Sequence, residues 1–468
     1  MSATQRHLEI VRPEESLGPA WRTLAWTSLA VFMAVLDGTV LFVAFPSIGR
    51  SFPLVSVADL SWILNAYTIV YGALLVPAGR LADRLGRRRV FLTGVLLFAM
   101  ASLAGGLSPS PVFIIGARVI QAIGGAMLTP SSLALVLAAF PQSKRAVAVS
   151  IWAAVGAFAA AVGPSLGSTI IQLGGWRWAF FVNLPFAIMA MIGGRRALEE
   201  SRSNSGEGVP DAVGIVQLIV GMALVALGVV RFRQSGAIMA VACIAAGIAI
   251  LIVFTRRASR VLSPALDLKL FAVPSFRYAN LATLVYGATF SAMFLGSVLF
   301  LTNVWGYSTF QAGLGITPGP LVVMGVAPLA GRFAARRGHR VLLIPGGILF
   351  ALAFFIRYLA TSPTPHYLTE WLPPMIASGV GVGLVLPSLV GAAAHSLPAE
   401  RLAVGSGVNQ ALRQIGGVLG VGAVIGMTGR AHGAQALPTF QVIFLLLVVG
   451  GLATAAISAA IDTKPRRS

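Results

Sequence analysis

The chain has 468 residues, of which 57% are hydrophobic and only 10% are charged, and its formal net charge is +20. Soluble domains carry roughly 25% charged residues, so this composition excludes an ordinary water-facing globular protein. The basic residues lie in short segments between long apolar runs, and the high charge therefore does not indicate a nucleic-acid-binding protein. We expect a protein that resides in the lipid bilayer and binds no nucleic acid.

Fourteen apolar runs follow one another along the chain, each near the ~20 residues that a helix needs to cross the hydrocarbon core. This pattern predicts an all-α polytopic membrane protein with fourteen transmembrane helices. The expected spans are 24–48, 60–79, 90–107, 111–139, 146–173, 178–194, 213–230, 236–254, 277–303, 311–331, 341–360, 371–394, 402–428 and 438–461.

The distribution of positive charge predicts the orientation of these spans. If the N-terminus lies in the cytoplasm, most of the 34 lysine and arginine residues fall in cytoplasmic segments and few fall in external loops. In this assignment Arg357 belongs to an external loop. We therefore expect both termini in the cytoplasm.

The first span carries Asp37, the only acidic residue near the middle of a span. Acidic side chains inside a membrane are costly and are functional candidates such as proton relays. The alternative is a protonated aspartate that hydrogen-bonds a neighbouring helix. Arg118 in the fourth span needs a partner for its charge, and Asp37 is the embedded acid that can supply it. The alternative for Arg118 is a side chain that reaches the external surface.

A loop between the second and third spans recurs between the tenth and eleventh. Residues 79–89 and 331–340 share glycines and arginines at a fixed offset in the sequence. Read as a duplication, the repeat predicts two six-helix halves with two inserted helices between them, and paired halves around a midplane site are a transporter architecture. The expected division is a cytoplasmic tail 1–23, an N-terminal half 24–194, a linker with two inserted helices 195–276, a C-terminal half 277–461 and a tail 462–468.

The repeated loop also predicts a conformational latch between the halves, with Asp83 facing a helix N-terminus and cytoplasmic arginines. The alternative is a basic loop that only sets the topology. Ala335 replaces the aspartate in the second copy, so such a latch is asymmetric. The residues assigned to the latch are Gly79, Arg80, Asp83, Arg84, Gly86 and Arg87.

Two further groups of residues are candidates for helix packing and for substrate contact. The fifth span is dense in glycine and proline, which predicts a close and kinked helix contact, or ordinary packing of small residues. Its residues are Gly156, Gly163, Pro164 and Gly167. The candidate residues of a substrate cavity are Phe42, Tyr67, Gln121, Asn409 and Arg413, and for the aromatic members the alternative is contact with lipid.

The chain contains no phosphate-binding GxxxxGK[ST] loop and no HExxH motif, and Cys243 is its single cysteine. A disulfide within the chain and a cysteine metal cluster are therefore excluded. We expect no cofactor and no metal, and a protein that is not an enzyme. An ion gradient rather than ATP is the expected source of energy.

These motifs together resemble the major facilitator superfamily, and specifically its fourteen-span drug:proton antiporters of the EmrB/QacA type. The departures are Phe42, where asparagine is usual, and Ala122, where glycine is usual. The segments that carry the resemblance are 36–46, 79–89, 118–124, 156–167, 176–185 and 405–417.

The resemblance implies proton-coupled export of hydrophobic or monocationic toxic compounds by alternating access, with Asp37 and Arg118 in the proton machinery. It implies a multi-pass protein of the bacterial plasma membrane that acts as a monomer on small hydrophobic substrates and protons. Export of an endogenous lipid or natural product remains an alternative, as does proton-coupled uptake of a nutrient.

Overall fold

The computed structural model describes residues 17–202, 211–232, 236–395, 397, 401–428 and 433–463. Most of the two predicted tails lies outside these residues. Every regular element in the described part of the chain is a helix. Thirteen helical segments are long and apolar enough to cross a membrane. The helix at the predicted span 402–428 is not among the thirteen, although it extends over 26 residues.

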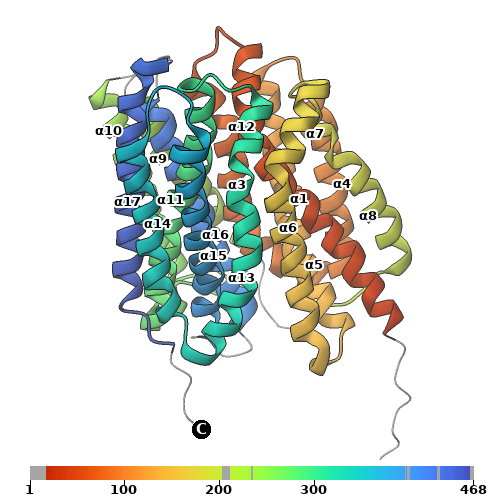
Figure 1. Cartoon of the computed structure of the whole chain (residues 1–468). Coiled ribbons are helices and arrows are strands. Elements are labelled where there is room, and N and C mark those ends of the chain that lie inside the picture. Colours follow the sequence, from red (N-terminus) through yellow and green to blue (C-terminus); the bar gives the residue numbers. More distant parts are fainter. Residues whose placement is uncertain are drawn as a thin grey trace, which may run out of the picture.

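The first eight helices, which we call the N bundle, occupy one side of the molecule (Figure 1). Turn signals set their limits: Pro111 opens one helix behind the capping residue Ser110, and Gly175, with a φ of 79°, follows the end of another. The helices are α1 (Gly18–Ser51), α2 (Val57–Leu60), α3 (Trp62–Leu85), α4 (Arg87–Gly106), α5 (Pro111–Ala139), α6 (Gln142–Gly174), α7 (Trp178–Phe181) and α8 (Asn183–Ala197).

The last helices form the C bundle, α11 to α17, on the other side of the molecule (Figure 1). Between the bundles in sequence, α9 packs against α10 and also contacts both α3 and α16, so it covers the seam between them. The bounds are α9 (Ala212–Arg231), α10 (Ala237–Ala258), η1 (Leu268–Ala272), α11 (Pro274–Asn303), α12 (Thr309–Ile316), α13 (Pro318–Arg337), α14 (Arg340–Ala360), η2 (Tyr367–Trp371), α15 (Leu372–His395), α16 (Leu402–Met427), η4 (Gly433–Ala436) and α17 (Leu437–Ser458).

The two copies of the repeated loop adopt the same turn. Gly86 follows α3 with a φ of 113°, and Gly338 follows α13 with a φ of 84°, a region that favours glycine. In each copy the residue after the glycine donates its backbone N–H to the segment that follows the last helix of its bundle. Arg87 donates to Ser201 O at 3.0 Å, and His339 donates to Thr463 Oγ1 at 2.9 Å. The sequence repeat is thus also a repeat in structure.

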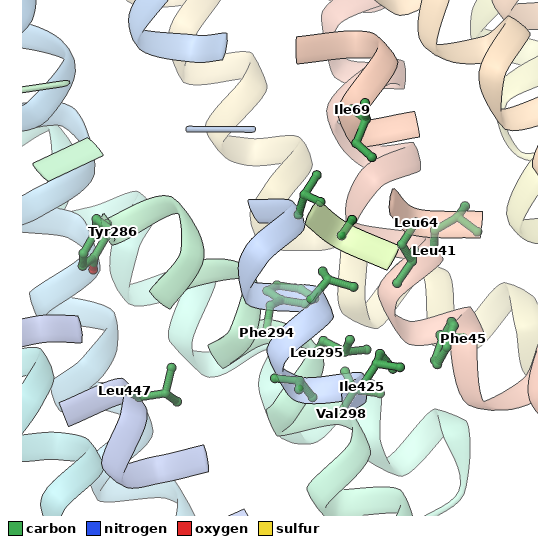
Figure 2. Packing of buried hydrophobic residues seen from close by; sticks show 14 of the residues in the cluster. Leu41, Phe45, Leu64, Ile69, Tyr286, Phe294, Leu295, Val298, Ile425 and Leu447 are labelled. Carbon is green, nitrogen blue, oxygen red and sulfur yellow. The ribbon is translucent and has the colours of Figure 1, made fainter. Parts of the chain in front are cut away.

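One hydrophobic core runs through both bundles (Figure 2). Leu41 and Leu64 of the N bundle belong to the same buried cluster as Phe294 of the C bundle. Phe42 lies with its ring centre 5.2 Å from that of Phe294. In the last turn of α1, Arg50 Nη2 donates to Thr309 Oγ1 at 2.8 Å. The helix that carries Asp37 therefore also carries contacts between the bundles.

Candidate functional site

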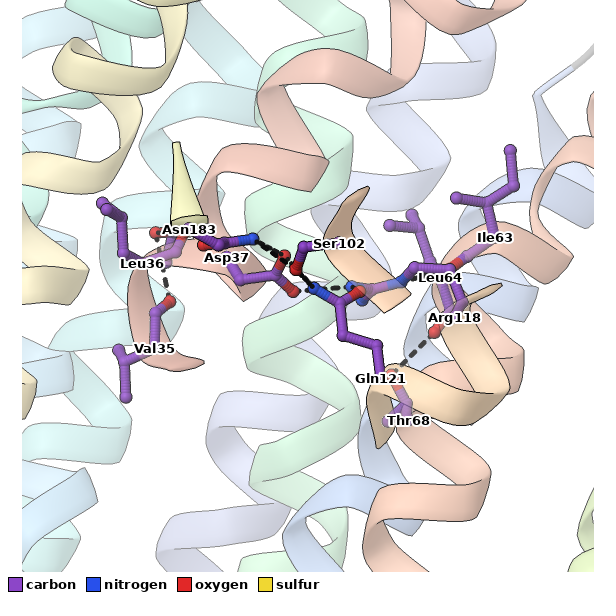
Figure 3. Close-up of polar contacts among 11 residues, drawn as sticks. Val35, Leu36, Asp37, Ile63, Leu64, Thr68, Ser102, Arg118, Gln121 and Asn183 are labelled. Carbon is purple, nitrogen blue, oxygen red and sulfur yellow. Dashed lines mark hydrogen bonds and ion pairs between the residues drawn. The ribbon is translucent and has the colours of Figure 1, made fainter. Parts of the chain in front are cut away.

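The centre of the N bundle holds a buried polar network around Asp37 (Figure 3). Arg118 of α5 forms an ion pair with Asp37 of α1, in which Nη1 lies 2.6 Å from Oδ2. Gln121 Nε2 and Asn183 Nδ2 each donate a 2.8 Å hydrogen bond to Asp37 Oδ1. None of these four side chains is more than 2% exposed. The carboxylate therefore has three donors in a site that is closed to solvent.

Groups from α3 and from its own helix, α5, hold Arg118 in this position. Its Nε donates to the carbonyl oxygen of Ile63 at 3.0 Å, and its Nη1 also donates to Gln121 Oε1 at 2.6 Å. Its guanidinium carbon lies 4.0 Å from the centre of the Tyr67 ring, and such a cation–π contact contributes up to about 2 kcal/mol when desolvated. Arg118 therefore does not reach toward the external surface, which was the alternative for this residue.

Two members of the network were missed by the sequence reasoning. Asn183, at the start of α8, binds Asp37, and Ser102 of α4 accepts hydrogen bonds from Gln121 at 2.9 Å and from Asn183 at 3.3 Å. An asparagine within an apolar run was an available signal for the first. A single serine in an apolar run gives no comparable signal, because serine is tolerated in buried helices at many positions.

The glycine-rich face of α6 packs directly on the helix that carries Asp37. A Cβ at Gly163 would overlap the Thr39 side chain, and a Cβ at Gly167 would come within 2.8 Å of Val40 Cγ2. Farther along, Gly156 lies in ordinary contact distance of α1. The carbonyl oxygen of Pro164 faces α12 of the C bundle, where a Cβ at Gly313 would approach it to 2.7 Å. The expected close contact of this segment is therefore present, and it joins α6 to α1 and to the C bundle.

The residues assigned to a latch make contacts mainly within the N bundle. Asp83 pairs with Arg87 one helical turn later, with 2.8 Å between Oδ1 and Nη2. Arg80 Nη1 donates to the carbonyl oxygen of Pro264, in the segment after α10, at 2.7 Å. Among the described residues the charged partner of Asp83 is Arg87, and a contact of Asp83 with a helix N-terminus of the C bundle stays a prediction.

The remaining latch residues pack the loop onto its neighbours. Gly79 faces Pro130 of α5, and the side chain of Arg84 is exposed. Glu200 lies over the loop and accepts a hydrogen bond from the backbone N–H of Arg88 at 3.1 Å. A carboxylate at a helix N-terminus satisfies free N–H groups and is favoured by the helix dipole. Glu200 thus fixes the start of α4 from the end of the N bundle.

The candidate cavity residues lie in different environments, and contact of any of them with a substrate stays a prediction. Gln121 is fully buried and belongs to the Asp37 network rather than to a cavity wall. Asn409 is 2% exposed and donates to Asn280 Oδ1 and to Thr283 Oγ1, so it holds α16 against α11. The amide N–H groups of both side chains thus donate to partners inside one bundle.

Three candidate cavity residues do lie where the bundles meet or next to the network. Phe42 contacts the C bundle, and Tyr67 lies between Arg118 and Tyr71, with which it stacks at 5.5 Å between ring centres. Arg413 is partly exposed near the middle of α16, and its Nε donates to Gln410 Oε1 at 3.1 Å. These side chains form the candidate substrate surface.

Arg357 was assigned to an external loop, and the structure corrects this assignment. Its side chain is fully buried in the last turn of α14. The guanidinium carbon lies 3.8 Å from the Trp371 ring centre and 5.0 Å from that of Phe354. Nη2 contacts the Trp371 carbonyl oxygen at 3.3 Å, whereas Nε and Nη1 have no hydrogen-bond partner among the described residues. The count of positive charges assigned Arg357 to a loop from its place in the sequence alone. It could not show that α14 continues past Arg357 and holds the side chain inside the bundle.

The described residues contain no group of three or more histidine, cysteine, aspartate or glutamate side chains arranged to hold a metal ion. The chemistry that the buried network can perform is proton binding at one carboxylate, with a change in the charge balance of its arginine partner.

A bundle of membrane-crossing helices built around one buried carboxylate–arginine pair defines a polytopic membrane protein of the transporter class. The family model described as Major Facilitator Superfamily matches residues 27–214 and 208–421. The chain belongs to the major facilitator superfamily.

Known relatives and solved structures agree with this family. The chain is 34% identical to the multidrug resistance protein Stp of Mycobacterium tuberculosis, over 86% of this chain and 75% of the relative. It is 32% identical to the tetracenomycin C resistance and export protein of Streptomyces glaucescens, over 88% and 76%. A bacterial homologue of the human lysosomal transporter Spinster, solved in an inward-facing and unoccupied conformation, shares the fold with a TM-score of 0.68 at 17% identity, over 97% of this chain and all of that one.

Proposed function

We propose that the protein is a proton-coupled exporter of hydrophobic small molecules, which exchanges substrate for inward-moving protons. The observation that carries this proposal is the closed Asp37–Arg118 pair, because it is a proton-binding group inside the membrane with a counter-ion that responds to its charge. Membership of the superfamily and the names of the resistance and export proteins to which the chain is similar support export.

We further propose the arrangement in which this exporter works. The N bundle (24–194) and the C bundle (277–461) are the two halves that rock against each other, with α9 and α10 as an insertion in the linker 195–276. Counting α16, the chain then crosses the membrane fourteen times, as six, two and six helices, in the EmrB/QacA-type branch. Both termini lie in the cytoplasm of a bacterial cell, and the exporter acts as a monomer in the plasma membrane without a cofactor.

Proton binding at Asp37 acts on the contact between the bundles through α1. A proton on the carboxylate removes the charge partner of Arg118, which weakens the hold of α5 on α1. The same helix carries Phe42 and Arg50, both of which contact the C bundle. A small displacement of α1 therefore changes the network and the contacts between the bundles together.

The cycle follows from this arrangement. In the outward-facing state Asp37 takes up a proton, and the carrier then turns inward, where the proton leaves and substrate binds between the bundles. Substrate favours the deprotonated site, so substrate and proton compete for the carrier. The proton gradient then drives export, because protonation is favoured on the outside and proton release on the inside.

Asp37→Asn tests this proposal, because the amide keeps the shape of the side chain and cannot be ionised. Cells that express the wild-type protein should resist a panel of hydrophobic drugs, and cells with Asp37→Asn should be as sensitive as cells without the protein. In inverted vesicles the same variant should lose transport driven by a pH gradient. Unchanged transport in Asp37→Asn would contradict the mechanism.

A further inference from the structure

The contact between α3 and α16 brings one arginine to the surface where the two bundles meet. A Cβ at Gly72 of α3 would come within 3.0 Å of Gln414 Cβ, and a Cβ at Gly407 of α16 would come within 2.9 Å of Val76 Cγ2. These close approaches place one face of α16 directly against the N bundle. Arg413 precedes Gln414 on this helix and is twelfth of its 26 residues. It therefore lies midway along the helix, where lipid rather than water surrounds the bundles.

The described residues supply no acidic partner for the charge of Arg413. Among the described residues its one hydrogen-bond acceptor is the neutral side chain of Gln410. The embedded carboxylate of the protein, Asp37, is already paired with Arg118. An unpaired cation inside a membrane is costly, and the usual solutions are an acidic partner or a bound anion. The Asp37–Arg118 pair is neutral when Asp37 is ionised. The charge of Arg413 therefore gives the contact between α3 and α16 a net positive charge.

Arg413 differs in position from Arg357, another arginine of the C bundle for which the described residues supply no acidic partner. Arg357 is fully enclosed by aromatic rings of the C bundle, whereas Arg413 is partly exposed at the contact between the bundles. A ligand that separates α3 from α16 would therefore meet the guanidinium of Arg413 without unfolding a helix.

Tyrosines of α3 connect Arg413 with the proton-binding pair. The Tyr71 hydroxyl lies beside Gln410, the partner of Arg413, and donates to Thr129 Oγ1 at 3.2 Å. The Tyr71 ring stacks on Tyr67 with an angle of 11° between the planes, and Tyr67 lies under Arg118. An aromatic molecule at Arg413 would thus have a flat aromatic neighbour, and the stack would connect it to the partner of Asp37.

We propose that Arg413 and Tyr71 form a binding site for aromatic substrates that carry an ionised acidic group, such as a carboxylate or a sulfonate. The guanidinium supplies charge-assisted hydrogen bonds to the anion, and the tyrosine supplies a surface for the ring. This inference rests on the proposed export function and narrows its substrate class. It makes lipophilic cations poor substrates, because a cation would be repelled by Arg413 and would find no free carboxylate.

Three dyes of different charge test the proposal on the purified protein. Anilinonaphthalenesulfonate and phenylnaphthylamine share one ring system and differ by the sulfonate, and ethidium is a cation. Binding to the wild-type protein in detergent, without a gradient, is compared with binding to Arg413→Gln and Arg413→Lys. Arg256→Gln is the matched control, because it removes one positive charge at an exposed position of α10.

The wild-type protein should bind the sulfonate about tenfold more tightly than the uncharged amine, which corresponds to 1.4 kcal/mol. Arg413→Gln should remove this preference and change the affinity for the uncharged amine less than about twofold, whereas Arg413→Lys and Arg256→Gln should keep it. Equal affinities in the wild-type protein, tighter binding of ethidium, or an unchanged preference in Arg413→Gln would overturn the proposal.

Transport driven by a pH gradient separates this inference from the function on which it rests. If the binding preference holds but proteoliposomes show no gradient-driven transport of the sulfonate, the exporter function fails and the assignment of the anion site stands. If gradient-driven transport occurs but favours ethidium over the sulfonate, the exporter function stands and the anion site is wrong.

Discussion

The two bundles bury arginines in opposite ways. In the N bundle, Arg118 is paired with a carboxylate and bound by neutral groups of α3 and of its own helix, α5. In the C bundle, Arg357 is buried to the same degree, yet aromatic rings take the place of an acid. Of these two arginines, Arg118 is the one whose described surroundings contain a carboxylate that a proton can neutralise. The two bundles share a repeated fold but differ in function in this account: the N bundle binds the proton, and the C bundle carries a fixed positive charge.

The largest expected effect comes from removing the carboxylate of the N bundle. Asp37→Ala leaves Arg118 buried without its counter-ion, which should destabilise the protein by about 3–5 kcal/mol and abolish transport. The double variant Asp37→Ala/Arg118→Leu should recover most of the stability but none of the transport. Unfolding by denaturant in detergent measures the first quantity. A double variant no more stable than Asp37→Ala would contradict the view that the pair is balanced.

Removing a buried charge from the C bundle should not destabilise the protein, in contrast to Asp37→Ala in the N bundle. Arg357→Met removes a buried charge that has no acidic partner and fills the aromatic cage with an apolar side chain. We expect the stability to be unchanged or to rise by about 1–4 kcal/mol, because the cost of desolvating the guanidinium disappears. Transport should remain. A loss of stability as large as that of Asp37→Ala would contradict the view that Arg357 is a buried charge without a balancing partner.

An added methyl group should be tolerated less well at the contact of α6 with α1 than at the glycine next to Asp37. A Cβ at Gly163 would overlap Thr39, so Gly163→Ala should cost about 1–3 kcal/mol and reduce transport. Gly38→Ala is the matched control, because nothing lies within 4 Å of its Cβ position. Combining Gly163→Ala with Thr39→Ala should restore part of the function, because it removes the hydroxyl but leaves the Thr39 Cβ 2.8 Å from the new methyl group. Thermal unfolding and transport of the four proteins check this prediction, and equal behaviour of Gly163→Ala and Gly38→Ala would contradict it.

The smallest effect concerns the loop of the C bundle, where His339 stands at the position of Arg87 in the repeat. Burial, with a smaller contribution from His395, lowers the pKa of His339 to about 4. The unfolded chain has a histidine pKa near ~6.5, so between these values it binds a proton that the folded protein does not. The stability should therefore fall as the pH drops from 6.5 toward 4. His339→Gln should reduce the fall in melting temperature between neutral and acidic pH, and an equal fall would contradict the assignment.

Much of the fold was predictable because a helix that crosses the bilayer needs an apolar run of a fixed minimum length. Apolar runs of spanning length located helices at all fourteen predicted ranges, and the sequence repeat at Gly86 and Gly338 corresponds to the same turn in both bundles. The pairing of Asp37 with Arg118 was also predictable, because an embedded acid is costly unless a nearby cation balances its charge.

The parts that could not be predicted depend on the direction in which side chains point. Hydropathy does not distinguish a residue of α14 that faces the bundle interior from one that faces a loop, so Arg357 was misplaced. Gln121 and Asn409 are polar residues on apolar helices, and the sequence does not reveal whether such a group meets a substrate or another helix. Their partners lie 84 and 129 residues away in the chain.

The central claim is that Asp37 alone links substrate movement to the proton gradient, and proteoliposomes test it most directly. Exchange of labelled for unlabelled substrate needs the carrier to alternate but needs no proton, whereas accumulation against a concentration gradient needs both. We predict that Asp37→Asn loses all accumulation driven by a pH gradient and keeps exchange only at substrate concentrations high enough to fill the weakened binding site. Continued pH-driven accumulation in Asp37→Asn would contradict the account.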